Sequence, residues 1–219
     1  MPVNSALRFQ YPFWDEPQKA SAPMVIVKGP LGGERAMDAY AWLLQEGLID
    51  LTGPIDGETY KAVSAQFAYL RHIDFKKPRH LFLNTPGGVV LDGLAIYDRI
   101  QQEKKSFPVA TTCNGMAASM GSILLCCGTD GMRSINRHGR VMIHQTRING
   151  GGGNVLTRED SRILDAELEH GTHTLAEIIS LHSGKPYDEV RKDMEKDTWL
   201  SAQQAKDYGP KGLVDIIRD

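Results

Sequence analysis

The segment that most constrains the fold runs from residue 109 to residue 128, where a strand pattern passes through small residues into an apolar run. Residues 109–113 have the character of a short buried strand, and residues 123–128 that of a buried helix. This transition puts Ser119 at a helix N-terminus, where unpaired N–H groups and the helix dipole favour negative charge. Taken alone, Ser119 is more typical of an ordinary N-cap residue than of a nucleophile.

Strand patterns alternate with helical spacing through the first 130 residues, which predicts an α/β fold with crossover connections. A longer, largely polar helix follows, and such a helix usually protrudes or meets another subunit. We expect one domain over 23–219, with 1–22 as an arm, a removable leader or a partner-binding segment. The expected strands are 24–27, 48–51, 81–84, 108–113, a pair near 132–135 and 141–144, and 213–217; the expected helices are 35–46, 58–72, 90–100, 119–127, 157–182, 187–195 and 201–209.

Composition excludes several classes of function. The 219 residues carry a formal net charge of -2 without a long basic run, so a nucleic-acid partner has little electrostatic support. No apolar run approaches the ~18 residues of a membrane span, and residues 1–20 lack the apolar core of a secretory signal. Three cysteines, two of them adjacent, are a poor basis for disulfides. We therefore expect a cytoplasmic protein.

A serine nucleophile needs a base, and histidine is the usual one near neutral pH. His144 stands out because it ends an apolar strand pattern and precedes a loop, which would fix its position yet leave it partly exposed. A histidine packed at the edge of the core fits the same pattern about as well. Of the other six, His72, His80 and His138 are expected to face solvent, and His170, His173 and His182 fall in the long helix.

Two further roles are less well determined by the residues alone. Asp197 lies where a charged stretch becomes apolar, which favours it slightly over Asp193 and Glu195 as a carboxylate that orients the base. Gly87-Gly88 follows a strand and forms either a tight turn or a backbone N–H donor for an oxyanion. Neither phosphate-loop nor metal-site spacing is present, so we predict no cofactor and no metal in this chain.

Separate motifs from about Pro23 to the C-terminus occur in one characteristic order. They include Asn84-Thr85-Pro86-Gly87-Gly88, Ala95-Ile96-Tyr97-Asp98, Gly115-Met116-Ala117-Ala118-Ser119-Met120-Gly121, Val141-Met142-Ile143-His144-Gln145 and Lys196-Asp197-Thr198-Trp199-Leu200. Together these motifs closely resemble ClpP, the family of proteolytic subunits of Clp proteases.

The resemblance implies a serine endopeptidase with Ser119 as nucleophile, His144 as general base and Asp197 as orienting carboxylate. It implies an oxyanion hole formed by the backbone N–H groups of Gly88 and Met120. The implied fold is a ClpP/crotonase-like spiral of βαβ units with a protruding helical handle at about 145–183. The implied partners are identical subunits in two stacked heptameric rings, an AAA+ ATPase that uses ATP, and unfolded polypeptide substrates.

The chain departs from the family pattern in four places. Thr146 replaces the usual proline, and residues 150–153 make the base of the handle glycine-rich. Glu195-Lys196 replaces a pair that usually ends in arginine, and lysine is a weaker bidentate partner. The segment 104–107 is slightly longer than usual. These departures affect coupling between rings and order in the handle, not the proposed triad.

Two other functions remain open from the sequence. A crotonase-type hydratase would use the glycine site on a coenzyme A thioester, but it would need an acidic pair near the glycines, which is not evident. A non-catalytic ring subunit would modulate an active paralogue. Such paralogues lose members of the triad, whereas this sequence retains all three residues.

Overall fold

The computed structural model of the chain describes residues 23–28, 32–73, 75–147 and 157–219. These residues fall into two compact units, which divide after residue 39 and which we describe separately. The predicted leader at 1–22 and the glycine-rich base of the handle at 150–153 lie outside the described residues.

The first unit contains an antiparallel pair of strands, β1 (Met24–Lys28) and β2 (Glu34–Asp38). The predicted strand at 24–27 is confirmed, but the predicted helix at 35–46 is wrong over its first four residues. Residues 34–38 pair one to one with residues 24–28, and the ladder competes with helical hydrogen bonds. Helix α1 therefore begins only at Ala39 and ends at Gln45.

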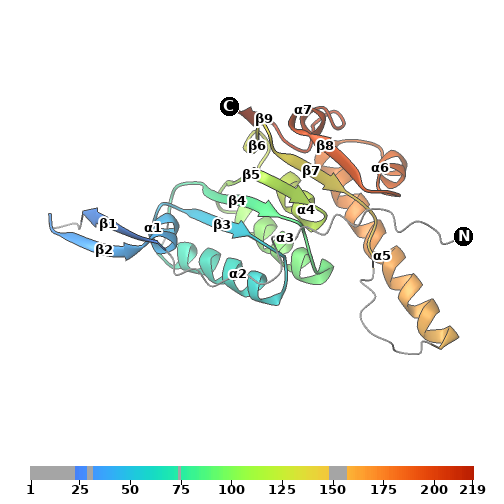
Figure 1. Cartoon of the computed structure of the whole chain (residues 1–219), viewed down its shortest axis with the longest axis horizontal. Helices are drawn as coiled ribbons and strands as arrows, with labels where there is room; N and C mark the ends of the chain where they lie inside the picture. Colours follow the sequence, from blue (N-terminus) through green and yellow to red (C-terminus); the bar gives the residue numbers. More distant parts are fainter. Residues whose placement is uncertain (1–22, 29–31, 74, 148–156) are drawn as a thin grey trace, which may run out of the picture. The chain divides into compact units, whose positions relative to one another are not determined.

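The second unit is built on a seven-stranded, mainly parallel sheet (Figure 1). Parallel neighbours run in the order β3, β4, β5, β6, β9, and β5 also pairs with β7 in parallel. β7 in turn pairs antiparallel with β8. The strands are β3 (Leu48–Thr52), β4 (Arg79–Thr85), β5 (Val109–Ala118), β6 (Arg133–Asn136), β7 (Arg140–Ile143), β8 (Thr198–Ser201) and β9 (Ile216–Arg218).

The long central strand β5 has two different neighbours along the edge that faces away from β4. Its first half, Thr111–Cys113, pairs with β6, and its second half, Met116–Ala118, pairs with β7. The prediction that 132–135 and 141–144 pair with each other is therefore wrong, because each of them pairs with β5 instead. β5 also continues through the small residues to Ala118, so Ser119 follows the strand directly.

Helices connect the strands and pack on the sheet. They are α2 (Gly57–His72), α3 (Val90–Lys104), α4 (Met120–Cys126), α5 (Arg158–Ser183), α6 (Tyr187–Asp193) and α7 (Ala202–Lys206). All residues of α4 are buried, as the apolar run predicts. Capping boxes begin two of the helices, one of Thr157 with Asp160 at α5 and one of Ser201 with Gln204 at α7. The N-terminal half of α5 is largely exposed and extends away from the sheet (Figure 1).

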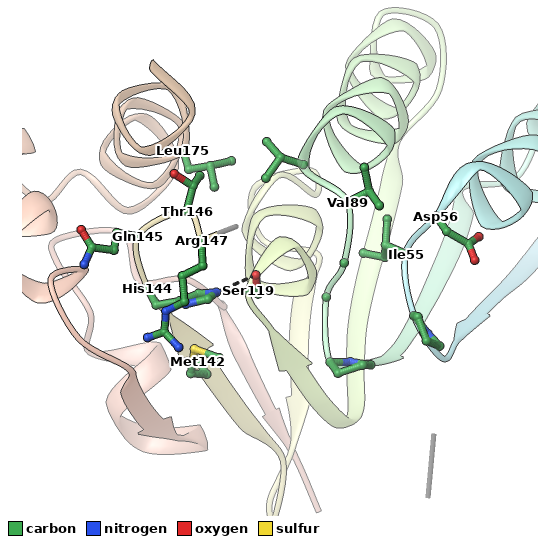
Figure 2. Close-up of a pocket in the computed structure, with 15 residues that line it drawn as sticks. Ile55, Asp56, Val89, Ser119, Met142, His144, Gln145, Thr146, Arg147 and Leu175 are labelled. Carbon is green, nitrogen blue, oxygen red and sulfur yellow. Dashed lines mark hydrogen bonds between the residues drawn. The ribbon is translucent and has the colours of Figure 1, made fainter. Parts of the chain in front are cut away.

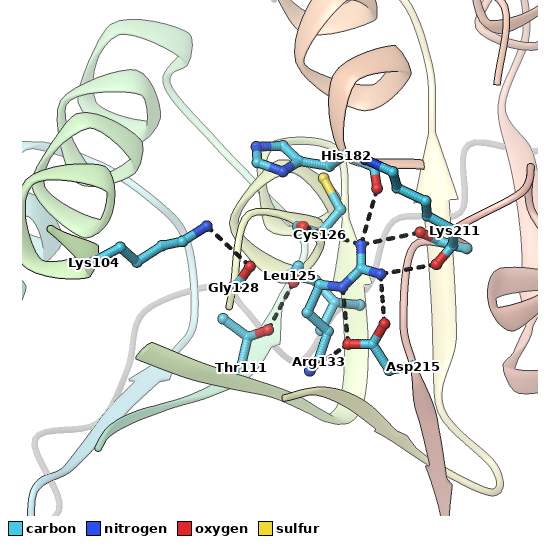
Figure 3. Close-up of polar contacts among 10 residues, drawn as sticks. Lys104, Thr111, Leu125, Cys126, Gly128, Arg133, His182, Lys211 and Asp215 are labelled. Carbon is cyan, nitrogen blue, oxygen red and sulfur yellow. Dashed lines mark hydrogen bonds and ion pairs between the residues drawn. The ribbon is translucent and has the colours of Figure 1, made fainter. Parts of the chain in front are cut away.

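A buried arginine holds the C-terminal segment against the sheet. Arg133 on β6 contacts Asp215 at 2.6 Å and donates to the carbonyl oxygens of Lys211 at 2.8 Å and of His182 and Gly212 at 3.1 Å each (Figure 3). One planar guanidinium thus satisfies carbonyls at the end of α5 and in the segment before β9. This network fixes the position of β9 beside β6.

Candidate active site

The predicted site residues lie at one edge of the sheet because of how the strands are directed. Ser119 follows β5 and His144 follows β7, and these two strands are parallel. β8 runs antiparallel to β7 with Thr198 opposite Ile143, so Asp197, just before β8, comes beside His144. Loops at the carboxyl ends of parallel strands are where α/β proteins usually bind ligands.

Ser119 occupies a strained turn between β5 and α4. Its φ of 54° is the only positive φ of a non-glycine residue among those the structure describes. Such a conformation costs roughly 1–3 kcal/mol and is found disproportionately at functional sites. Its N–H donates to the carbonyl of Met142 at 2.8 Å, and its carbonyl accepts from the N–H of Ser122 at 2.9 Å. The backbone is thereby fixed on both sides of the side chain.

The side chain of Ser119 does not cap the helix. Ser119 stands at the N-cap position of α4 but makes no capping hydrogen bond through its side chain. Its Oγ lies 2.8 Å from Nε2 of His144 instead. The interpretation of Ser119 as an ordinary N-cap residue is therefore wrong, because the turn directs the hydroxyl toward the imidazole (Figure 2).

His144 has the environment of a neutral base. Its side chain is only 14% exposed. Burial lowers the pKa of His144 below its usual 6.5, the positive charge of Arg147 lowers it further, and the carboxylate of Asp197 opposes both. A lowered pKa keeps the imidazole neutral at pH 7, so Nε2 can accept the proton of the Ser119 hydroxyl. In that tautomer the ring proton is on Nδ1.

Asp197 lies near this proton but is engaged elsewhere. Its Oδ1 is 3.5 Å from Nδ1 of His144, and the buried Nδ1 has no hydrogen-bond partner among the described residues. The same Oδ1 forms an ion pair with Nη2 of Arg147, and Oδ2 lies 3.5 Å from Nη1. Sequence reasoning did not identify Arg147, since a single arginine in a loop carries no recognisable pattern.

Gly87 and Gly88 let the loop after β4 approach its neighbours closely. A Cβ atom on Gly88 would lie 2.0 Å from the carbonyl oxygen of Ile55, and one on Gly87 would lie 2.6 Å from Cβ of Ser119. Gly87 also has a φ of 90°, which side chains disfavour. Among the described residues the N–H of Gly88 donates to no acceptor. Met120 is the first residue of α4, where N–H groups have no partner within the helix.

A cleft of about 690 Å³ opens over these groups (Figure 2). Ser119 and His144 lie between an apolar side formed by Ile55 and Val89 and the segment that follows His144. The lining residues are Pro54, Ile55, Asp56, Pro86, Gly87, Gly88, Val89, Val90, Ser119, Met142, His144, Gln145, Thr146, Arg147 and Leu175.

Thr146 anchors one wall of the cleft to α5. Its N–H donates to Oγ1 of Thr172 at 3.1 Å, and its hydroxyl donates to the carbonyl of Leu168 at 2.6 Å. A proline at this position could make neither hydrogen bond. Thr146, which stands where the usual residue is proline, therefore makes contacts that hold the segment after His144 in place.

None of the other six histidines lines the cleft. His72 and His138 are exposed, as predicted. His80 is half-buried and so less exposed than predicted, since on its face of β4 it stacks on Phe82 and contacts Oγ1 of Thr112 at 2.6 Å. Strand alternation accounts for this, because residues 80 and 82 share one face. Burial lowers the pKa of His80 to about 4.

No group of three or more His, Cys, Asp or Glu side chains within the described ranges is placed to hold a metal ion. No helix in the described part of the chain is both long and apolar enough to cross a membrane.

A serine at a strained strand-to-helix turn, hydrogen-bonded to a neutral histidine in a cleft, defines a site of the serine hydrolase class. The model of the Clp protease family matches residues 31–219. The chain is 37% identical over 209 residues to the ATP-dependent Clp protease proteolytic subunit 1 of Salinibacter ruber, covering 95% of this chain and 85% of the relative. It is 40% identical over 198 residues to the ATP-dependent Clp protease proteolytic subunit of Bdellovibrio bacteriovorus, covering 89% and 91%.

The chain therefore belongs to the Clp protease family. Membership makes it a peptidase, which confirms the resemblance drawn from the motifs. The mixed α/β fold with a largely parallel sheet is the one predicted for this family.

Proposed function

We propose that the chain is the proteolytic subunit of a Clp-type protease that uses Ser119, His144 and Asp197 as its catalytic triad. The observation that carries the proposal is the 2.8 Å hydrogen bond between Oγ of Ser119 and Nε2 of His144, which both line the cleft. A hydroxyl becomes a useful nucleophile only when such a base accepts its proton. Asp197 is the one carboxylate within reach of the other ring nitrogen among the described residues.

The reaction follows from this geometry. Oγ of Ser119 attacks the carbonyl carbon of the peptide while its proton passes to Nε2 of His144. The tetrahedral intermediate collapses, the C–N bond breaks, and His144 returns the proton to the leaving amine. Water then attacks the acyl-enzyme, with His144 again accepting the proton, and restores the free serine.

The oxyanion of the intermediate needs donors beside Ser119. We assign this role to the N–H groups of Gly88 and Met120. The assignment is supported by the unengaged N–H of Gly88 and by the close approach of Gly87 to Ser119 and Met120. Each such donor contributes about 3–4 kcal/mol to stabilising the transition state.

We further propose that the subunit works in the cytoplasm within two stacked heptameric rings that receive unfolded polypeptide from an AAA+ ATPase. Both relatives are named as subunits of ATP-dependent proteases. The exposed half of α5, with Ile163 54% exposed, offers a surface for contact between subunits. The three cysteines are free, buried thiols, which suits a reducing compartment.

The test of the catalytic assignment is covalent labelling with a fluorophosphonate probe. The wild type should label and cleave a fluorogenic peptide, and Ser119→Ala should do neither while keeping the assembly of the wild type. Ser106→Ala, which removes an exposed hydroxyl after α3, is the matched control and should label normally. Labelling that persists in Ser119→Ala would overturn the assignment.

A further inference from the structure

Two hydrogen-bond donors, the neutral imidazole of His144 and the guanidinium of Arg147, compete for the carboxylate of Asp197. Oδ1 of Asp197 is shared between Nδ1 of His144, at 3.5 Å, and Nη2 of Arg147, which is closer. A hydrogen bond from an imidazole N–H needs a donor–acceptor distance of about 2.7–3.2 Å, so the link from His144 to Asp197 is not made. The buried Nδ1 is left without a partner in the described structure.

The competition favours Arg147 for a simple electrostatic reason. The guanidinium is always charged and presents two N–H groups to the two carboxylate oxygens, whereas the neutral imidazole offers one N–H. Arg147 is held within range because Thr146, the preceding residue, is anchored to α5 by hydrogen bonds to Leu168 and Thr172. The side chain of Arg147 is 49% exposed, so the ion pair with Asp197 can exchange.

We propose that Arg147 is a positioning residue that draws the carboxylate of Asp197 away from His144 and so sets the fraction of subunits with a complete triad. The inference rests on the proposed function, since it assumes that Asp197 orients His144. A residue outside the triad would then control whether the hydrogen bond between Asp197 and His144 forms.

Within the described residues, two charged groups act on the imidazole. Arg147 comes from its own loop and Asp197 from the segment before β8. α4 contributes the Ser119 hydroxyl, α3 contributes the apolar Val90 at the cleft, and the contacts from α5 are made to Thr146. Removing the positive charge of Arg147 would raise the pKa of His144, and a closer Asp197 would raise it again. Both effects move the acid limb of the activity profile to higher pH.

The experiment compares Arg147→Gln with wild type on a fluorogenic peptide across pH. We expect kcat at the plateau to rise by about threefold to tenfold, a small part of the ~10⁴-fold supplied by the orienting carboxylate of a triad. KM should change by less than about twofold, because the apolar side of the cleft at Ile55 and Val89 is unchanged. The acid limb should move to higher pH. Arg147→Lys keeps the charge and should stay nearer to wild type in its acid limb.

A double-mutant cycle shows whether Arg147 acts through Asp197. In the background of Asp197→Asn, Arg147→Gln should give no rise in kcat, since the carboxylate to be released is gone. An unchanged or lowered kcat in the single variant, an unmoved acid limb, or the same rise in both backgrounds would each overturn the proposal. Fluorophosphonate labelling separates the two hypotheses. If labelling depends on Ser119 and one of these three contradicting results is found, only the role of Arg147 is rejected. If labelling does not depend on Ser119, the triad itself is rejected.

Discussion

At the scale of single residues, the site depends on backbone positions that few side chains could occupy. Ser119 holds a φ of 54° between two backbone hydrogen bonds, and Gly88 leaves no room for a Cβ beside the Ile55 carbonyl. The strain at Ser119 is offset by the packing of α4, which is buried throughout. The hydroxyl is thus aimed at His144 before any substrate is bound.

Gly88→Ala tests the proposed oxyanion donor. The added Cβ would lie 2.0 Å from the carbonyl oxygen of Ile55, so the loop must shift and carry its N–H away from the reaction centre. Loss of one oxyanion donor lowers kcat by about 10²–10³-fold, and we expect a loss of this size with KM little changed. Gly33→Ala is the control, because a Cβ there meets nothing within 4 Å. Normal peptide cleavage by Gly88→Ala would contradict the assignment.

At the scale of elements, local patterns predicted most strands and helices of the sheet domain. The strand at 48–51, the helix at 58–72 and the buried helix after Ser119 all form close to their expected bounds. β8 was missed, since its four residues become a strand only by pairing with β7. The prediction of helix at 35–38 fails for a similar reason, since β2 forms a strand by pairing with β1. Pairings between distant segments are not encoded in the local periodicity of either segment.

The network around Arg133 tests how the C-terminal element is held. Arg133→Met leaves Asp215 and several buried carbonyls without their partner, and breaking a buried ion pair in this way costs about 3–5 kcal/mol. Arg137→Met breaks the ion pair with Asp219, an exposed contact, and should unfold close to wild type. Urea unfolding followed by circular dichroism gives the unfolding midpoint of each variant. Equal midpoints for the two variants would contradict the account.

At the scale of the whole molecule, the site could be predicted only in part. His144 and Asp197 were weak candidates by position and became strong ones through the family resemblance. Their convergence depends on β7 and β8, whose pairing brings residues 144 and 197 together over a long sequence separation. Arg147 could not be foreseen, because its importance lies in one ion pair and not in a motif.

The whole molecule is predicted to assemble into two rings of seven subunits. Native mass spectrometry should give a mass near fourteen times the 24.2 kDa of one chain, at several salt concentrations. The expectation follows from the family and from the exposed apolar side chains on α5, where Leu181 is 64% exposed. A mass near that of one chain under all these conditions would contradict the proposed rings.

The most direct test of the central claim is to locate the adduct left by a fluorophosphonate. Peptide mapping by mass spectrometry after complete inactivation should find one adduct per chain, on Ser119. The same sample should have lost its peptidase activity in proportion to the adduct. An adduct on another residue, or complete loss of activity with Ser119 unmodified, would contradict the claim that this hydroxyl, activated by His144, is the nucleophile.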